Sequence, residues 1–103
     1  MENNYVLDIA PLAAIDLEEA FRYISEELQN PDAAFALINE IDKALDKVCL
    51  FPESFPLIQN KYVKDKAVRK LSVKNYIVFY KVHENTVQVV RVIYGMRNYE
   101  DIL

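Results

Sequence analysis

The amino-acid sequence predicts an α+β fold, in which an N-terminal strand and an antiparallel helical hairpin pack on an antiparallel β-sheet formed mainly by a C-terminal three-stranded meander. Two segments have apolar residues spaced three and four apart, as in helices, and only Asn30-Pro31 separates them. Ala67 to Tyr99 resembles three consecutive strands joined by short polar turns. Because helices and strands are grouped rather than alternating, the class is α+β.

Tyr5 to Ile9 is a short strand candidate, and Pro11 then suits the first turn of a helix, where its missing N–H costs nothing. Acidic residues lie early in this helix, where the helix dipole favours negative charge: Asp16, Glu18 and Glu19. One apolar stripe predicts its buried face: Leu17, Phe21, Ile24 and Leu28.

The second helix is predicted to begin with Asn30 as its cap and Pro31 at its first position, and to end at Phe51-Pro52. Its apolar stripe contains Ala34, Leu37, Ile38, Ile41, Leu45 and Val48. Since the connection between the two helices is so short, they must be antiparallel neighbours.

A loop is expected from Glu53 to Lys66, followed by the meander. Tyr76 to Val82 is apolar on both faces, which places it in the middle of the sheet, and Val87 to Ile93 is similarly rich. The helical hairpin covers one face, so a chain terminus or a partner should cover part of the other.

The composition excludes several kinds of site. The 103 residues suit one domain, residues 1–103, and one Cys and one His allow neither a disulfide nor a zinc cluster. The single glycine excludes a glycine-rich phosphate loop, so no cofactor or metal is expected. No apolar run approaches ~20 residues and no secretory signal is visible, which predicts a cytoplasmic protein without a membrane span.

Charge is distributed unevenly along the chain. Residues 1–56 carry twelve acids and three bases, a net −9, whereas residues 57–103 carry nine bases and four acids, a net +5. The second half could therefore meet an anionic partner. Alternatively, acidic helices cover the outside while lysines keep the sheet edges soluble.

The residues that could carry chemistry are a basic and tyrosine set in the second half: Arg69, Lys70, Arg91, Tyr94, Arg97 and Tyr99. Arginine binds phosphate or carboxylate with two parallel hydrogen bonds, and tyrosine adds stacking, so the set could bind nucleic acid or an acidic peptide. The alternative is structural, with Arg91 or Arg97 paired to an acid of the helical hairpin. His83 fits a solvated turn, and Cys49 fits the core.

Several strings, in this order, resemble the RelE/ParE superfamily of toxins from bacterial type II toxin–antitoxin modules, which stabilise plasmids. They are DLEEAFRYI, NPDAA, FPESFP, VRKLSVKNYIVFY and VRVIYGMRNYEDIL. The resemblance implies a helical hairpin on an antiparallel sheet. It also implies a small antitoxin whose C-terminal segment wraps and blocks the toxin in a hetero-oligomer.

The superfamily divides into RelE-like toxins, which cut mRNA on the ribosome, and ParE-like toxins, which poison DNA gyrase. Ile77 stands where RelE has an arginine, and Val68 stands where a lysine companion of Lys70 is expected. The terminal tyrosine of the nuclease set would fall on Leu103, unless Tyr94 or Tyr99 substitutes. The nuclease set is therefore incomplete.

The resemblance is nearer the ParE branch, where arginine is usual at Arg69 and Arg91, although Tyr94 falls where a histidine is often seen. We therefore expect growth arrest through gyrase, with Arg69, Arg91 and Arg97 as contacts to target or antitoxin. A ribosome-dependent mRNA endonuclease would instead use the catalytic candidates Lys70, Arg97, Tyr94 and Tyr99. A third hypothesis is an inactive homologue that only binds its antitoxin.

Overall fold

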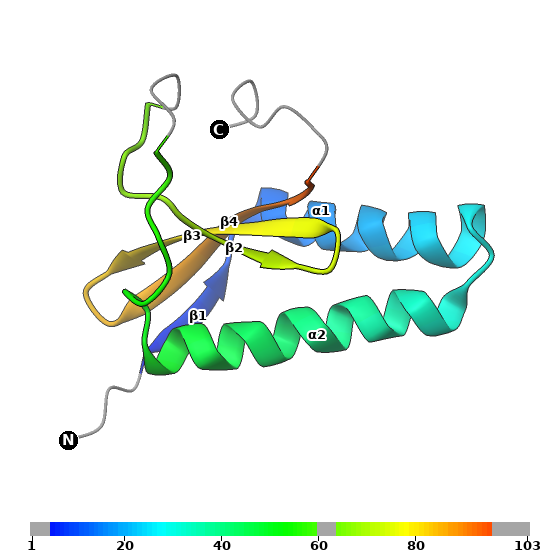
Figure 1. The fold of residues 1–103 in the computed structure, drawn as a ribbon, viewed down its shortest axis with the longest axis horizontal. Coiled ribbons are helices and arrows are strands. Elements are labelled where there is room, and N and C mark those ends of the chain that lie inside the picture. The colour runs from blue at the N-terminus through cyan, green and yellow to red at the C-terminus, as the bar shows by residue number, and fades with distance from the viewer. Residues whose placement is uncertain (1–4, 60–63, 96–103) are drawn as a thin grey trace.

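The computed structural model describes residues 5–59 and 64–95 and has the predicted α+β architecture (Figure 1). Its elements follow in the order β1 (Val6–Ile9), α1 (Pro11–Arg22), the π-helix η1 (Tyr23–Glu27), α2 (Pro31–Leu50), β2 (Arg69–Val73), β3 (Tyr76–His83) and β4 (Thr86–Tyr94).

The two helices form the predicted antiparallel hairpin, and both pack on the same side of the sheet (Figure 1). Asn30 caps α2, because its Oδ1 accepts a hydrogen bond from the backbone N–H of Ala33 at 3.1 Å. Pro31 takes the first helical position, and α2 ends where Phe51 donates its N–H to the carbonyl of Lys47 at 3.0 Å. Local sequence signals therefore determine both ends of this helix.

The last turn of the first helix differs from a continuous α-helix. It widens into η1, where the N–H of Leu28 bonds the carbonyl of Tyr23 at 3.1 Å. Leu17 and Ile24 of the predicted stripe pack against the core, but Leu28 is 56% exposed, so its predicted burial is wrong. Leu28 follows the last helical turn, at the tip of the hairpin, which extends beyond the sheet (Figure 1).

The sheet has the strand order β1-β4-β3-β2, with the predicted antiparallel meander and with β3 inside it. β1 joins the edge of β4 in parallel, from Val6 opposite Thr86 to Ile9 opposite Val89, so the complete sheet is mixed. One irregularity interrupts the pairing of β3 with β4, between Phe79 and Tyr80.

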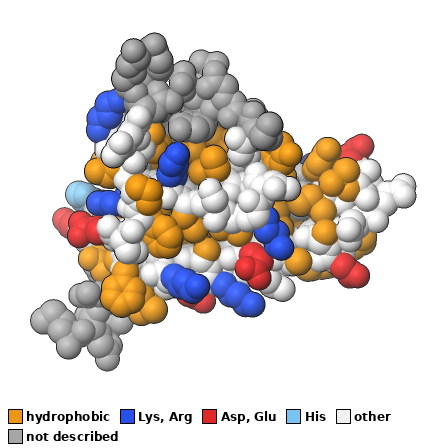
Figure 2. All heavy atoms as spheres, in the orientation of Figure 1, with side chains coloured by type: hydrophobic (Ala, Val, Ile, Leu, Met, Phe, Trp, Pro, Cys, Tyr) orange, Lys and Arg blue, Asp and Glu red, His pale blue; other side chains and the backbone are white. Residues whose placement is uncertain are grey.

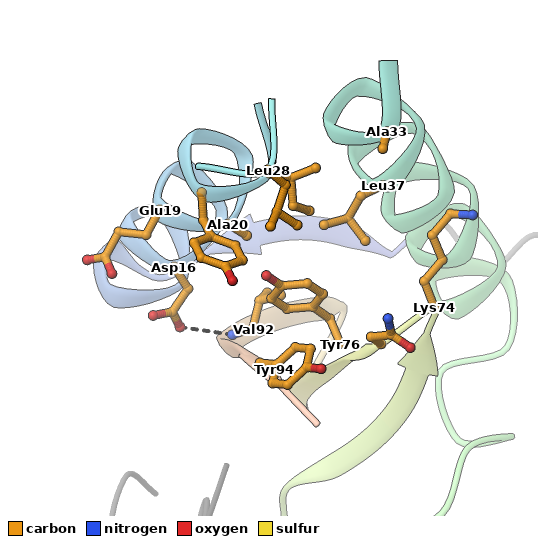
Figure 3. Close-up of a pocket in the computed structure, with 13 residues that line it drawn as sticks. Asp16, Glu19, Ala20, Leu28, Ala33, Leu37, Lys74, Tyr76, Val92 and Tyr94 are labelled. Atoms are coloured by element: carbon orange, nitrogen blue, oxygen red, sulfur yellow. Dashed lines mark hydrogen bonds between the residues drawn. The ribbon is translucent and has the colours of Figure 1, made fainter. Parts of the chain in front are cut away.

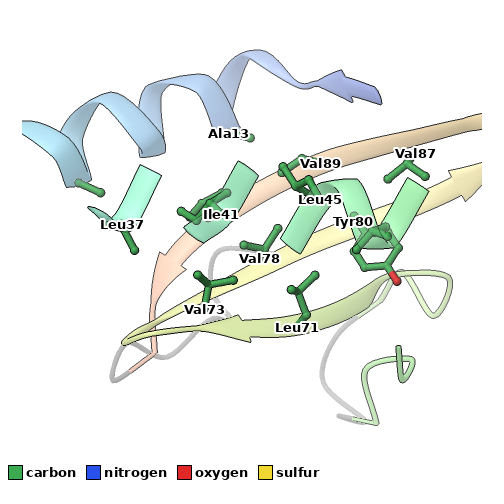
Figure 4. Packing of buried hydrophobic residues seen from close by; sticks show 13 residues of the cluster. Ala13, Leu37, Ile41, Leu45, Leu71, Val73, Val78, Tyr80, Val87 and Val89 are labelled. Carbon is green, nitrogen blue, oxygen red and sulfur yellow. The ribbon is translucent and has the colours of Figure 1, made fainter. Parts of the chain in front are cut away.

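The main core lies between the sheet and the helices (Figure 4). Leu37, Ile41 and Leu45 of α2 face residues of β2 and β3, among them Leu71, Val73, Val78 and Tyr80. Each such buried side chain stabilises the fold by roughly 1.5–3 kcal/mol relative to an exposed one.

A smaller cluster lies on the opposite face of the sheet, which we call the outer face: Ile58, Val68, Phe79 and Ile93, with Ile77 and Val90 packed against it. Ile58 comes from the loop after α2, and its N–H bonds the carbonyl of Val68 at 2.9 Å. Part of the outer face is thus covered by the loop after α2, whereas the sequence predicts a chain terminus or a partner there.

Candidate functional site

Arg91 lies in an ion pair with Asp16 of α1. Its Nε donates to Asp16 Oδ2 at 2.7 Å and its Nη2 donates to Oδ1 at 2.9 Å. The two side chains are only 18% and 11% exposed. The hydrogen bonds from the guanidinium to Asp16 raise the pKa of Arg91 above its ordinary value, although burial acts in the opposite direction. The alternative of a structural ion pair is therefore confirmed for Arg91.

Asp16 also completes the edge of β4. Strand β1 pairs with β4 only as far as Val89, and beyond that point Asp16 Oδ2 accepts the backbone N–H of Val92 at 2.9 Å. The dipole interpretation of Asp16 is wrong, since the first turn of α1 contains no acidic residue. The carboxylate instead joins α1 to the edge strand.

The irregularity in the β3–β4 pairing accompanies this contact. Phe79 pairs with Arg91 and Tyr80 pairs with Val89, which leaves Val90 as the extra residue of a β-bulge. A bulge changes the direction of the side chains beside it, and here Arg91 reaches the edge that faces α1.

Arg69 also makes internal contacts, in this case with the loop that follows α2. Its Nη1 donates to the carbonyl of Phe55 at 2.6 Å and to that of Glu53 at 3.3 Å. Beside it, the hydroxyl of the fully buried Tyr80 donates to the carbonyl of Pro52 at 2.6 Å. Burial raises the pKa of Tyr80 to about 12, although the charge of Arg69 acts against this shift. We call this set the loop contacts.

Lys70 and Tyr94, two of the catalytic candidates, lie on opposite faces of the sheet. Lys70 pairs with Phe79 of the outer face, whereas its neighbour Leu71 belongs to the core beneath the helices. Tyr94 pairs with Tyr76 on the helix side, three residues further along β3. At ~3.3 Å per residue, this offset of three residues separates Lys70 and Tyr94 by about 10 Å along the sheet, in addition to their position on opposite faces. The other two candidates, Arg97 and Tyr99, lie outside the described residues.

Cys49 and His83 have the predicted surroundings. Cys49 packs against the main core, and burial raises the pKa of its thiol, which disfavours the reactive thiolate. His83 is exposed at the end of β3, with its Nε2 3.8 Å from Glu84. In residues 5–59 and 64–95 no group of acids, His or Cys could hold a metal ion, and no helix is long and apolar enough to cross a membrane.

A pocket of about 640 Å³ opens between the helical hairpin and the far end of the meander (Figure 3). The helices contribute Asp16, Glu19, Ala20, Tyr23, Ile24, Leu28, Ala33 and Leu37, and the sheet contributes Lys74, Asn75, Tyr76, Val92 and Tyr94. Of the predicted site residues that the structure describes, only Tyr94 lines it. Sequence reasoning missed this pocket because its walls come from segments that meet only in the folded chain.

Comparison with known proteins gives a family. Residues 7–99 match the family model described as the ParE toxin of type II toxin–antitoxin system, parDE. No curated protein matches the chain.

One similar solved structure is described as the chromosomal ParDE TA system from P. aeruginosa. It has 16% sequence identity and a TM-score of 0.73, over 90% of this chain and 98% of that one. At this identity the likeness shows the fold, while the family match covers most of the sequence. The chain therefore belongs to the family of ParE toxins of type II toxin–antitoxin systems.

Proposed function

We propose that this toxin arrests bacterial growth by binding DNA gyrase in the cytoplasm, and that a cognate antitoxin neutralises it. The family match supports the toxin function, and one observation favours gyrase binding over RNA cleavage as its mechanism. Lys70 and Tyr94, which is one of the two tyrosines that a nuclease could use beside Lys70, lie on opposite faces of the sheet.

Proton transfer requires a general acid or base within roughly 2.6–3.2 Å of the reacting group, or one bridging water. Side chains separated by the thickness of a sheet and about 10 Å along it cannot meet at one phosphate. The face seen in Figure 2 also shows Lys and Arg side chains scattered among apolar ones rather than gathered in a patch. A protein that binds RNA mainly through phosphates would be expected to gather them.

Among the three arginines predicted from the sequence, we propose Arg97, which lies outside the described residues, as the target contact. Arg69 donates a hydrogen bond to Phe55, and Arg91 donates one to Asp16. We expect their replacement to act mainly through the fold, and a direct contact of either with gyrase or antitoxin stays a prediction.

The test is induced expression without an antitoxin, combined with assays on the purified chain. We expect growth to stop, gyrase supercoiling to be inhibited and gyrase–DNA cleavage complexes to accumulate. Arg97→Ala should weaken all three effects at least about tenfold, whereas the exposed Lys43→Ala serves as the matched control. Lys70→Ala should still arrest growth, because the proposed gyrase contact does not use Lys70.

Cut mRNA in translating ribosomes, with gyrase unaffected, would contradict this proposal and support the endonuclease. Normal growth with a folded protein would leave only an antitoxin-binding module. Co-expression of a small reading frame beside the toxin gene should restore growth if it encodes the antitoxin.

A further inference from the structure

The two edges of the sheet differ in how the chain covers them. At the β2 edge, the loop after α2 runs alongside the strand: Leu57 forms an antiparallel bridge with Arg69, and Lys70 donates its N–H to the carbonyl of Pro56 at 3.1 Å. At the other edge, β1 has β4 as its only neighbouring strand among the described residues. An uncovered edge strand presents unpaired backbone groups to which another strand can bind.

Alternate residues of β1 direct their backbone groups toward β4 or away from it. The N–H of Val6 bonds the carbonyl of Asn85 at 2.7 Å, and Ala10 donates to β4 in the same way at 2.9 Å. Because backbone N–H and C=O groups alternate sides along a strand, those of Leu7 and Ile9 point to the free edge. At these two positions β1 therefore offers a second strand both a donor and an acceptor.

The side chains of β1 are also unusually exposed for a strand. Val6 and Leu7 are 57% and 39% exposed, and Asp8 is exposed as well. Leu7 lies on the helix side, opposite Val87 of the main core, whereas Val6 lies on the outer face. A neighbouring strand would cover apolar side chains on both faces of this edge, and such cross-strand pairs stabilise a sheet.

We propose that β1 pairs with β1 of a second copy of this chain, antiparallel and about a two-fold axis that passes beside Leu7. A two-fold contact of this kind is self-complementary, since the same strand supplies both halves. Leu7 faces Leu7 of the second copy, and Tyr5 of each chain pairs with Ile9 of the other. The two four-stranded sheets thus join into one continuous sheet. This dimer goes beyond the proposed function and does not depend on it.

Charge favours this register over the neighbouring one. A shift that places Asp8 opposite Asp8 of the second copy brings two carboxylates together on one face, and like charges directly opposite are destabilising. Asp8 accepts a hydrogen bond from the neutral amide of Gln88 at 3.0 Å, a contact that does not neutralise its charge. With Leu7 on the axis, Asp8 instead lies opposite the apolar Val6 of the second copy.

The first test is sedimentation velocity on the purified full chain from about 1 μM to about 1 mM, the range in which small interfaces dissociate. We expect the mass to rise from 12.0 kDa toward twice that value. Leu7→Arg removes an apolar contact and places two like charges on the axis, so it should weaken the dimer at least about tenfold. Phe35→Arg adds the same charge at a 60% exposed position of α2 and should leave the dimer unchanged.

Position 6 tests the register with charge. Val6→Lys places an ammonium group opposite Asp8 of the second copy, twice in the dimer, and should tighten the dimer about three- to tenfold. Val6→Glu is the matched control of opposite sign and should weaken the dimer by a similar factor. Since Val6 is 57% exposed, both variants keep the core intact.

Disulfide cross-linking tests the same register independently of affinity. In chains that also carry Cys49→Ala, Val6→Cys and Asp8→Cys each supply a single thiol. A mixture of the two variants should cross-link under mild oxidation, because directly opposite Cα atoms of such a pair lie about 4.5 Å apart. Either variant alone should not, since its two thiols lie on a diagonal at about 7–8 Å.

A chain that stays monomeric over the whole concentration range would overturn the inference, and so would a dimer that Leu7→Arg does not weaken. Cross-linking of either cysteine variant alone, or weaker association of Val6→Lys, would overturn it too, because the strands would then meet in another register. Growth arrest is not a readout of these experiments, so the dimer and the proposed function can fail separately.

Discussion

Two arginines attach the sheet to its surroundings at opposite edges, and they bind different kinds of partner. At the β4 edge, Arg91 pairs with the carboxylate of Asp16, where both charges are largely withdrawn from water. Toward the β2 edge, Arg69 donates to the carbonyl oxygens of Glu53 and Phe55. One contact joins two charges, and the other joins one charge to neutral groups.

The difference determines what remains when an arginine is removed. An ion pair deprived of one member leaves a buried charge without compensation, which costs much more than the net value of the pair. A loop carbonyl that loses its donor can instead accept a hydrogen bond from water. The two edges should therefore respond very differently to the same substitution.

The largest effect is expected at the Asp16–Arg91 ion pair. Arg91→Ala leaves a carboxylate 11% exposed and should lower the free energy of unfolding by about 3–5 kcal/mol in urea titrations. The double variant Asp16→Ala/Arg91→Met removes both charges and should recover part of this loss, although Val92 still lacks its acceptor. Single and double variants that are equally unstable would contradict this account.

The second effect concerns alkaline pH at the loop contacts. The pKa of Tyr80 is about 12 in the folded chain against 10.0 for the free side chain. Below pH 10 the phenol is protonated in both the folded and the unfolded chain, and its full contribution to the free energy of unfolding is present. Between pH 10 and 12 the unfolded chain loses the proton first, so the free energy of unfolding falls by roughly 3 kcal/mol.

Urea titrations across this range, compared with Tyr80→Phe, isolate the contribution. At neutral pH Tyr80→Phe should lose about 1–3 kcal/mol, because the carbonyl of Pro52 loses its buried donor. The gap between the two proteins should close as the pH rises toward 12. A gap independent of pH would show that the phenol is not protected from ionisation.

The smallest effect is expected for Arg69. Arg69→Ala should cost about 1–2 kcal/mol, since the released carbonyls become hydrated, and Arg69→Lys should recover part of it through one remaining donor. Proteolysis of the loop between α2 and β2 should accelerate in the alanine variant. A loss of stability as large as that of Arg91→Ala would contradict this account, because it would mean that water does not reach the released carbonyl oxygens.

The sequence predicted those features of the fold that local chemistry determines. Asn30 and Pro31 begin α2 because a side-chain cap and a proline at the first position are local requirements. Tyr76–His83 is an inner strand, as predicted, because its apolar side chains point to both faces of the sheet and both sets are buried there.

The features that failed or were missed depend on distant partners. A period of two predicts a strand at residues 5–9 but not the parallel pairing with β4. Asp16 was assigned to the helix dipole, because its partner lies 75 positions away. Of the described residues that line the pocket, the sequence predicted only Tyr94 as a site residue, because the pocket forms only where the hairpin and the meander meet.

The parallel pairing of β1 has a consequence for how this protein is made. Asp8 bonds Gln88 across 80 positions, and the contact of Asp16 with Arg91 spans almost as many. During synthesis, β1 therefore cannot pair until β4 has been made, and this edge of the sheet forms only then. Contacts between such distant positions slow folding. A message truncated before β4 would yield a chain in which β1 lacks its partner strand and Asp16 lacks Arg91, so this edge of the sheet forms only after β4 has been synthesised.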